Sequence, residues 1–354
     1  MSMGVSIIIC CHNSAKELPQ TLTHLAAQAV DSDVDWEVIV IDNASSDDTA
    51  KAATSLWPQD AITPMRVVSE PKLGIINARY RGIAEARYEI LSFIDDDNWV
   101  CPTWVQTVSD VMSEHPEVGA CGSKNIPEFE GEKPWWFDLS GKSYAVGSQG
   151  PESGGDVTWT EACLVGAGLS LRKTAAQQLI EAGFQSLLVG CKGKALNRGE
   201  DTEICFALVL AGWHLWYEPR LQLKHFLTAD RLHWKYLRRL RRGGGRATLG
   251  FDPYRLVFEE CEHKHDISFW WHTKSSETRQ PDRRIWQQQL FSAFKDLLRH
   301  PLTLVSSLIQ PMEGDIRALK TETRIGRFLE LLQSRETYDI NIQTVKSAAW
   351  RKDH

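Results

Sequence analysis

The chain has 354 residues, of which 42% are hydrophobic and 24% are charged. These shares are ordinary for a folded soluble chain and argue against a disordered or fibrous protein. With 40 Lys and Arg against 46 Asp and Glu, the formal net charge is −6, which gives no electrostatic case for a nucleic acid as partner. The length predicts one large domain with an appendage, or two domains.

The cysteines predict neither a metal cluster nor a redox pair, because no C-x-x-C motif occurs. Most of the eight lie in apolar runs, where cysteine acts as a small buried hydrophobe. The start, MSMGVSIIICCHN, lacks the basic region and the long apolar run of a signal peptide. No run approaches the roughly 18 apolar residues of a membrane-spanning helix. We therefore expect a cytosolic protein, with peripheral contact on the inner face of a membrane left open.

The first part of the chain alternates short apolar runs with segments of helical spacing. Strands are predicted at Val5–Cys11, Trp36–Ile41, Met65–Ser69 and Tyr88–Ile94, and helices at Ser14–Gln28, Gly74–Ala86 and Pro102–Ser113. This rhythm predicts an α/β fold, in which a mostly parallel, Rossmann-like sheet has helices on both faces. Ligands of such sheets bind at the carboxyl ends of the strands.

The segment Pro127–Asp156 is rich in glycine and carries the pair Trp135-Trp136. We expect a long irregular segment here, of the kind that is usually functional or mobile. The elements predicted after it are strands at Leu164–Leu171, Trp213–Tyr217 and Leu221–Phe226, and helices at Thr174–Ala182 and from Asp201 onward. After about residue 228 the pattern is mainly helical, so we expect one domain at 1–228 and a helical extension at 229–354.

Two segments of the extension have more than one interpretation. Arg231–Arg246 holds basic residues and no acidic ones, and its amphipathic helix is predicted to end at Gly243-Gly244-Gly245. It forms a solvated face, closes over a bound diphosphate, or docks on anionic lipid. The apolar helix Trp286–Leu308 packs on the preceding domain or attaches to a membrane surface.

Acidic residues follow two of the predicted strands. Asp95, Asp96 and Asp97 come directly after the fourth strand, and adjacent anions repel unless a cation or donors compensate them. Asp95 and Asp97 point the same way on an extended segment and suit Mg²⁺ or Mn²⁺ bound together with phosphate oxygens. A solvated acidic turn is the alternative. Asp42 ends the second strand, where it either accepts bonds from a nucleoside or caps the next helix.

Further candidates lie beside these acids. Lys72 and Arg79 flank a glycine that precedes a helix, and such residues hold a diphosphate or pair with aspartates. Asp201 begins a helix, either as a first-turn acid or as a general base that takes a proton from an acceptor hydroxyl. His225 stands among apolar residues, as a structural residue or as a ligand for Mn²⁺.

Together these segments resemble the inverting family-2 glycosyltransferases with the GT-A fold, over roughly residues 4–245. The matching pieces are Val5–Asn13, Val40–Thr49, Asn77–Gly82, Phe93–Asp97 and Gly199–Asp201. Later segments, at Tyr144–Gly147, Gly166–Gly168 and Trp213–Pro219, resemble a bacterial subset associated with surface-polysaccharide assembly. His12 is a departure, since many relatives have a tyrosine there. The processive motif Q-x-x-R-W is absent, which favours an enzyme that adds a single sugar.

The resemblance implies a donor half at about 1–125 and an acceptor half at about 126–228. The residues expected to bind the nucleotide sugar, with UDP as the nucleotide, are Cys11, His12, Asn13, Asp42, Lys72, Arg79, Asp95 and Asp96. The metal, Mn²⁺ or Mg²⁺, is expected on Asp95, Asp97 and His225, and Asp201 is expected to be the base. The acceptor is a saccharide or a lipid-linked saccharide.

Glu200 and the tryptophans Trp135 and Trp136 are expected to contact the acceptor, because indole faces pack well against sugar C–H groups. Two other functions stay open. A nucleotidyltransferase would carry a Gly-rich basic loop near its N-terminus, whereas here the first strand runs into Cys11-His12-Asn13. A non-catalytic module that binds a sugar nucleotide would have no need of a base such as Asp201.

Overall fold

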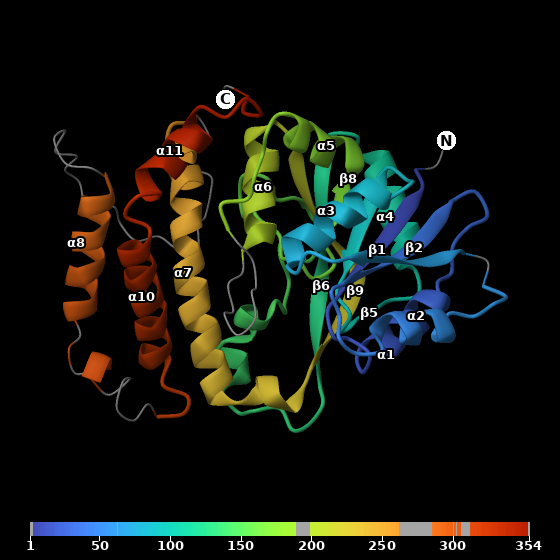
Figure 1. Cartoon of the computed structure of the whole chain (residues 1–354), viewed down its shortest axis with the longest axis horizontal. Helices are drawn as coiled ribbons and strands as arrows, with labels where there is room; N and C mark the ends of the chain where they lie inside the picture. The colour runs from blue at the N-terminus through green and yellow to red at the C-terminus, as the bar shows by residue number, and fades with distance from the viewer. Residues whose placement is uncertain are drawn as a thin grey trace.

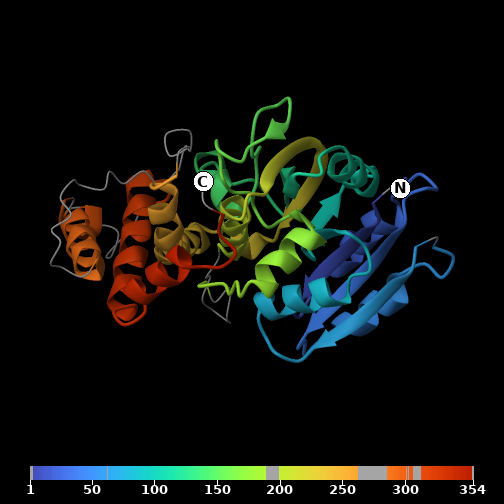
Figure 2. The ribbon, with the colours of Figure 1, turned by 90° about the horizontal axis from the view of Figure 1, so that it is seen from above.

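The computed structural model describes residues 3–61, 63–188, 199–261, 285–299, 301, 303–305 and 312–352. A mixed sheet with helices on both faces forms one side of the molecule, and helices from the last third of the chain form the other side (Figure 1). Seen from above, the C-terminal helices lie beside the sheet and do not cover it (Figure 2).

The sheet has nine strands in the order β3-β2-β1-β4-β8-β6-β9-β5, and β7 pairs with β9. The strands are β1 Val5–Cys11, β2 Trp36–Asn43, β3 Met65–Glu70, β4 Ile90–Ile94, β5 Asn98–Val100, β6 Val118–Phe129, β7 Gly155–Asp156, β8 Ser170–Arg172 and β9 His214–Leu227. The half β3-β2-β1-β4 is parallel, as predicted, whereas β8, β5 and β7 are antiparallel to their neighbours. The expected Rossmann-like sheet is therefore confirmed in this half, and the other half is mixed.

The helices are α1 Leu18–Ala26, α2 Thr49–Leu56, α3 Ile75–Glu85, α4 Trp104–Glu114, α5 Lys173–Glu181, α6 Glu200–Leu210, α7 Trp234–Phe258, α8 Ile285–Leu298, α10 Ile316–Gln333 and α11 Tyr338–Lys346. On β1, Ile7 and Ile9 pack with α1, α2 and α4, whereas Ile8 packs with α3, α5 and α6. Successive residues of a strand point to opposite faces, so the continuous apolar run of β1 fills both cores. Within the described residues, we find no helix with the length and apolarity needed to cross a membrane.

Three details differ from the sequence predictions. The predicted strand Leu164–Leu171 is only the short β8, and the two late strands are one long strand, β9. The pairing of β9 with β6 is irregular near Pro219, which allows the strand to continue past a residue that lacks an N–H donor. Strand β6 was not predicted, because Val118–Phe129 includes glycines, lysine and proline and has no continuous apolar run.

The predicted stop at Gly243-Gly244-Gly245 is wrong, because α7 continues through these glycines to Phe258. A methyl group on Gly245 would lie 2.0 Å from the Thr323 carbonyl oxygen of α10, and one on Gly326 would lie 2.0 Å from the Arg242 carbonyl oxygen. The glycines therefore serve the close approach of two helices and not the end of one. The predicted helix Trp286–Leu308 is observed as α8, and part of its remainder lies outside the described residues.

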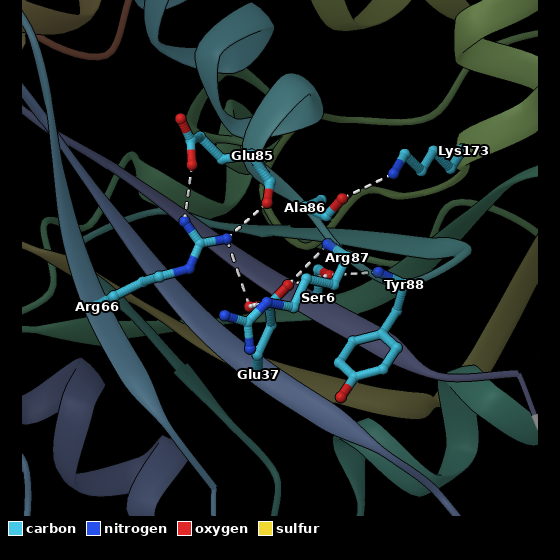
Figure 3. Close-up of polar contacts among 8 residues, drawn as sticks. All are labelled: Ser6, Glu37, Arg66, Glu85, Ala86, Arg87, Tyr88 and Lys173. Carbon is cyan, nitrogen blue, oxygen red and sulfur yellow. Dashed lines mark hydrogen bonds and ion pairs between the residues drawn. The ribbon is translucent and has the colours of Figure 1, made fainter.

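A buried carboxylate joins the strands at the end of the sheet where β2 begins (Figure 3). Glu37 is 1% exposed and accepts hydrogen bonds from Ser6 Oγ at 2.9 Å and from the Arg87 backbone N–H at 2.8 Å. Arg66 of β3 lies 3.4 Å from Glu37 and 2.9 Å from Glu85 of α3. This network connects β1, β2, β3 and the end of α3 on the side opposite to the carboxyl ends of the strands.

The seven cysteines within the described residues are free thiols, and most are buried, as the sequence predicted. Cys191 lies outside the described residues.

The neighbouring glycines of α7 give a matched test of the helix contact. Gly245→Ala should destabilise the fold by about 1–3 kcal/mol, because its methyl group meets α10 backbone. Gly244→Ala should stabilise the fold by about 0.5–1 kcal/mol, because a methyl group there meets nothing within 4 Å and alanine is the better helix former. Urea unfolding of both variants measures these changes, and equal effects would contradict the close contact.

Candidate active site

The carboxyl ends of β1 and β2 place His12, Asn13 and Asp42 at one edge of the sheet. Cys11 pairs in register with Asp42, and His12 Nδ1 lies 2.8 Å from the Asn43 carbonyl oxygen. Asn13 has a φ of 56° and its Oδ1 accepts from the Ser46 backbone N–H at 2.8 Å. The loops after β1 and β2 are thus fixed to each other, as a nucleotide site at this edge requires.

One of the expected residues can take part only through its backbone. The side chain of Cys11 is 1% exposed and packs in the core with α1 and α4. Its thiol therefore cannot reach a nucleotide, which corrects a side-chain role for this residue. Burial raises the pKa of the Cys11 thiol well above its usual range, so the group stays neutral.

The buried amide of Asn43 positions the loop that carries Lys72. Its Nδ2 donates to the carbonyl oxygens of Glu70 at 3.0 Å and of Lys72 at 2.8 Å. Its Oδ1 accepts from the Gly74 backbone N–H at 2.8 Å. Asn43 directly follows Asp42, and its positioning role depends on partners 27 to 31 residues away that the sequence pattern does not reveal. The side chain of Lys72 is exposed beside the site.

Asp97 is buried and is compensated by His225 of β9 and by Arg231 of the turn that follows β9. Arg231 Nη1 donates to Asp97 Oδ2 at 2.7 Å, and His225 Nε2 lies 3.6 Å from the same oxygen. Asn98 Nδ2 donates to the other oxygen at 3.0 Å. Burial alone would raise the pKa of Asp97, but His225 and Arg231 outweigh it and lower that pKa to about 2. Arg231 therefore lies at the candidate site, whereas the sequence pattern indicated only that it begins the basic segment Arg231–Arg246.

The neighbouring aspartates are compensated less completely than Asp97. Burial and the Asp97 carboxylate raise the pKa values of Asp95 and Asp96, against the lowering effect of nearby arginines. The raised pKa values reflect first the burial of Asp95 and Asp96 and then the repulsion of the adjacent carboxylates. A cation that binds here relieves this repulsion.

The expected set of three metal ligands is not assembled in this structure. Among the described residues, no group of three or more His, Cys, Asp or Glu side chains is placed to hold a metal ion. Asp97 and His225 do lie together, and the buried Nδ1 of His225 has no hydrogen-bond partner among the described residues. One carboxylate and one imidazole fit a divalent ion whose other ligands are diphosphate oxygens.

Arg79 of α3 connects the aspartates with the start of α6. Its guanidinium lies 3.3 Å from Glu200 and stands over the Phe93 ring at 5.8 Å. Burial by itself lowers the pKa of Arg79, but the charges of Glu200, Asp201 and Asp95 together raise it. The structure therefore brings the expected base and one of the expected aspartates to the same buried cation.

Asp201 is half-buried in the first turn of α6. Its Oδ2 accepts from the Gly166 backbone N–H at 2.6 Å, and its Oδ1 accepts from the Thr202 backbone N–H at 2.8 Å. A methyl group on Gly166 would lie 2.9 Å from Arg79 Nη2 and 3.2 Å from Asp201 Oδ2. Glycine at this position allows the backbone to reach the carboxylate.

A buried acid in the first turn of α6 holds the helix start in place. Glu203 is fully buried and accepts from the Tyr254 hydroxyl at 2.9 Å and from the Leu187 backbone N–H at 2.7 Å, and it also bonds Ser186. Burial raises the pKa of Glu203. The sequence signal for this residue was weak, because an acid in a first helical turn usually needs no explanation beyond the helix dipole.

The two tryptophans expected at the acceptor have different environments. Trp136 is fully buried, its ring packs edge-on against Trp234, and its indole N–H donates to Glu313 at 2.6 Å. A direct contact of Trp136 with an acceptor is therefore wrong, because the apolar core holds its ring. Trp135 is 70% exposed and remains a candidate.

The Arg79–Glu200 pair gives a test by double-mutant cycle. We expect Arg79→Gln and Glu200→Gln to be coupled by about 1–3 kcal/mol in stability, because both side chains are largely buried. The matched pair on the same helix, Arg81 and Glu85, is more exposed and should be coupled by less than about 1 kcal/mol. Equal coupling energies would contradict a buried charge cluster at Arg79.

Residues 6–170 match the model of the family described as glycosyl transferase family 2. The chain is 25% identical over 148 residues to the glycosyltransferase GlyG of Streptococcus pneumoniae serotype 4, a match that covers 41% of this chain and 47% of GlyG. It is 30% identical over 119 residues to an uncharacterized glycosyltransferase of Nostoc, covering 33% of this chain and 35% of that protein. The chain thus matches less than half of the length of either relative.

Solved structures give the same fold. The mannosyltransferase PcManGT from Pyrobaculum calidifontis, in complex with GDP-Man and Mn²⁺, has a TM-score of 0.55 at 14% identity, over 96% of this chain and 88% of that one. S. aureus TarS has a TM-score of 0.50 at 16% identity, over 97% of this chain and 55% of that one. The family match includes the strand ends at Asp42 and Asp97, so residues 6–170 belong to glycosyl transferase family 2, and the chain has the GT-A fold.

Proposed function

We propose that the protein is a metal-dependent inverting glycosyltransferase, which moves a sugar from a nucleotide sugar to an acceptor hydroxyl during polysaccharide or glycoconjugate synthesis. The observation that carries the proposal is the position of Arg79, whose guanidinium lies 3.3 Å from Glu200 and over the ring of Phe93, on the strand that leads into Asp95. Arg79 Nη2 and Asp201 also face the same point beside Gly166. A carboxylate cluster suited to a metal and a separate carboxylate suited to proton transfer thus lie around one cation. Their roles need this proximity, because donor and acceptor react at one carbon.

The donor is proposed to lie along the carboxyl ends of β1, β2 and β4. Asp42, with His12 and Asn13, is in reach of a nucleoside at the loops after β1 and β2, and Lys72 supplies a positive charge nearby. We propose a UDP-sugar as donor, with residues about 1–125 as the donor half and about 126–228 as the acceptor half. Because PcManGT is in complex with GDP-Man, a GDP-sugar is the alternative donor to test against a UDP-sugar.

The divalent ion would be held by Asp97 and His225, with Asp95 nearby, and it would neutralise the charge of the leaving diphosphate. Arg79 and Arg231 are the cations of this chain that stand next to that site. Arg231 now pairs with Asp97 at 2.7 Å, and a diphosphate would offer its guanidinium a second anionic partner. Fixed cations next to a developing charge stabilise the transition state without reorganisation.

Asp201 is proposed to take the proton from the acceptor hydroxyl as that oxygen attacks the anomeric carbon from the face opposite to the diphosphate. The attack inverts the configuration of that carbon. The backbone N–H groups of Gly166 and Thr202 fix the orientation of the Asp201 carboxylate. A nucleotidyltransferase has no equivalent use for a second carboxylate site of this kind, and a binding module has no use for a base.

A pair of isosteric substitutions separates the two roles. Asp201→Asn should reduce transfer by at least about 10³-fold, within the range of general-base loss, and leave Mn²⁺-dependent UDP binding close to that of the unmodified chain. Asp97→Asn should weaken that binding by about tenfold or more, because the ion loses its charged ligand. Calorimetry with UDP or GDP, in the presence and absence of Mn²⁺, measures nucleotide binding. A turnover assay measures sugar transfer. Transfer at the unmodified rate by Asp201→Asn would overturn the assignment of the base.

Trp135 is the tryptophan now proposed to contact the acceptor. Trp135→Ala should raise the KM for the acceptor by about three- to tenfold, in keeping with about 1 kcal/mol for a lost aromatic contact, and should leave the KM for the donor unchanged. Trp135→Phe keeps a ring and should recover most of the loss. An equal rise of both KM values in Trp135→Ala would point to a general structural effect.

A further inference from the structure

An open pocket of about 600 Å³ lies between the glycine-rich segment after β6 and the helices α7 and α10. These elements come from distant parts of the sequence and lie side by side at the same end of the molecule (Figures 1 and 2). The wall includes Pro127 of β6, Lys142 of the 3₁₀ turn Gly141–Tyr144, Arg241 of α7, and Lys320 of α10. The volume is in the range of sites that hold small molecules.

The cations on this wall lack anionic partners. Among the described residues, Arg241, Lys142 and Lys320 form no ion pair, and the buried Nε of Arg241 has no hydrogen-bond partner. The hydrogen bond from Arg241 Nη1 to Ser143 Oγ is long, at 3.5 Å. The carboxylate that also lines the pocket, Asp138, is paired with Lys133 at 2.7 Å.

Other arginines of the same helix are compensated. Arg238 and Arg242 both pair with Glu322 of α10, at 2.5 and 2.7 Å, and Arg246 lies 3.5 Å from Glu330. The contact between α7 and α10 thus provides a carboxylate for each of these three side chains. Arg241 is desolvated by its surroundings without such a partner, and burial lowers its pKa. An anion in the pocket would offset that cost.

The segments that line the pocket are bonded to segments that carry residues of the candidate active site. Pro127 pairs in register with His225 between β6 and β9. Asn125, which also lines the pocket, donates through Nδ2 to the Ala167 carbonyl oxygen at 3.1 Å. Ala167 directly follows Gly166, whose N–H holds the Asp201 carboxylate. The pocket therefore lies on the acceptor half, next to the proposed base and metal site.

We propose that this pocket binds a phosphate group of the acceptor, so that the acceptor is a phosphorylated saccharide or a saccharide joined to a lipid through phosphate. The inference rests on the proposed glycosyltransferase function and adds the acceptor class to it. Arg241 offers a planar fork of donors that matches phosphate oxygens, and Lys142 and Lys320 add mobile charge at the mouth.

The test measures binding to the full chain with the donor site blocked by saturating UDP and Mn²⁺. The probes are farnesyl diphosphate, a lipid source of phosphate, and galactose 1-phosphate, a water-soluble source. Farnesol and methyl galactoside are their uncharged counterparts. The variants are Arg241→Gln and, as a control with the same loss of charge on the same helix, Arg239→Gln, whose side chain is exposed and does not line the pocket.

We expect at least one phosphate probe to bind and its uncharged counterpart to bind at least about tenfold more weakly. Arg241→Gln should lower the affinity for the phosphate probe by a similar factor, and Arg239→Gln should leave that affinity unchanged. Binding of farnesyl diphosphate alone assigns the lipid-linked acceptor, and binding of both probes assigns phosphate itself as sufficient. Equal binding by the two variants, or equal binding of charged and uncharged probes, would overturn the inference.

A second readout separates this inference from the proposed function. If the unmodified chain does not bind UDP in the presence of Mn²⁺, that result counts against the glycosyltransferase mechanism, whether or not the phosphate probes bind. Transfer to an uncharged acceptor with a KM unaffected by Arg241→Gln would sink the phosphate pocket and leave the glycosyltransferase in place. Circular dichroism and UDP affinity of Arg241→Gln show whether the variant is folded.

Discussion

Charge compensation at the end of β4 is the constraint on which the site depends. Three adjacent carboxylates repel one another in a largely buried place, and burial together with that repulsion raises the pKa values of Asp95 and Asp96. Two arginines from other parts of the chain approach the cluster. Arg79 comes from α3, and Arg231 comes from the turn before α7. The fold must bring both to the carboxyl edge of the sheet, and this determines how α3 and the chain after β9 are placed.

The same constraint explains why the C-terminal helices belong to the site. Arg231 lies at the start of the path that leads into α7, and Tyr254 near the other end of α7 bonds the buried Glu203 of α6. The segment from Arg231 through α7 thus contacts Asp97 at one end and Glu203 of α6 at the other. Its close contact with α10 at Gly245 and Gly326 fixes the helix that carries these groups. The extension therefore packs against the candidate site through contacts with Asp97 and with Glu203 of α6.

Much of the parallel half of the fold could be predicted, because its signals are local. The apolar run of β1 and the strand before Asp95 are continuous and short, and buried parallel strands require this pattern. Strand β6 and the long strand β9 could not be predicted, because their pairing joins residues about 100 positions apart and includes Pro219. The continuation of α7 through three glycines could not be predicted either, because Gly245 is required by its close contact with Thr323 of α10.

The site shows the same division between local and distant signals. Asp42, the aspartate triplet and Asp201 could be proposed from strand ends and a helix start, because each stands directly after a readable element. The roles of Arg231 and Glu203 could not be predicted, because they depend on partners that are 134 and 51 residues away. Trp136 was misassigned for this reason, since the core that buries it is completed by Trp234. Pairing to a distant residue, rather than residue type, decides which polar and aromatic groups remain available to a ligand.

That principle also distinguishes the arginines of α7. By composition Arg238, Arg241 and Arg242 are equivalent, and a basic amphipathic helix alone would predict a general affinity for anions. Glu322 of α10, only 1% exposed, takes up two of them. The remaining one, Arg241, faces a pocket with Lys142 and Lys320. The helix pair therefore leaves Arg241, among these three arginines, available to an anion in the pocket, where a phosphate of the proposed acceptor would be held.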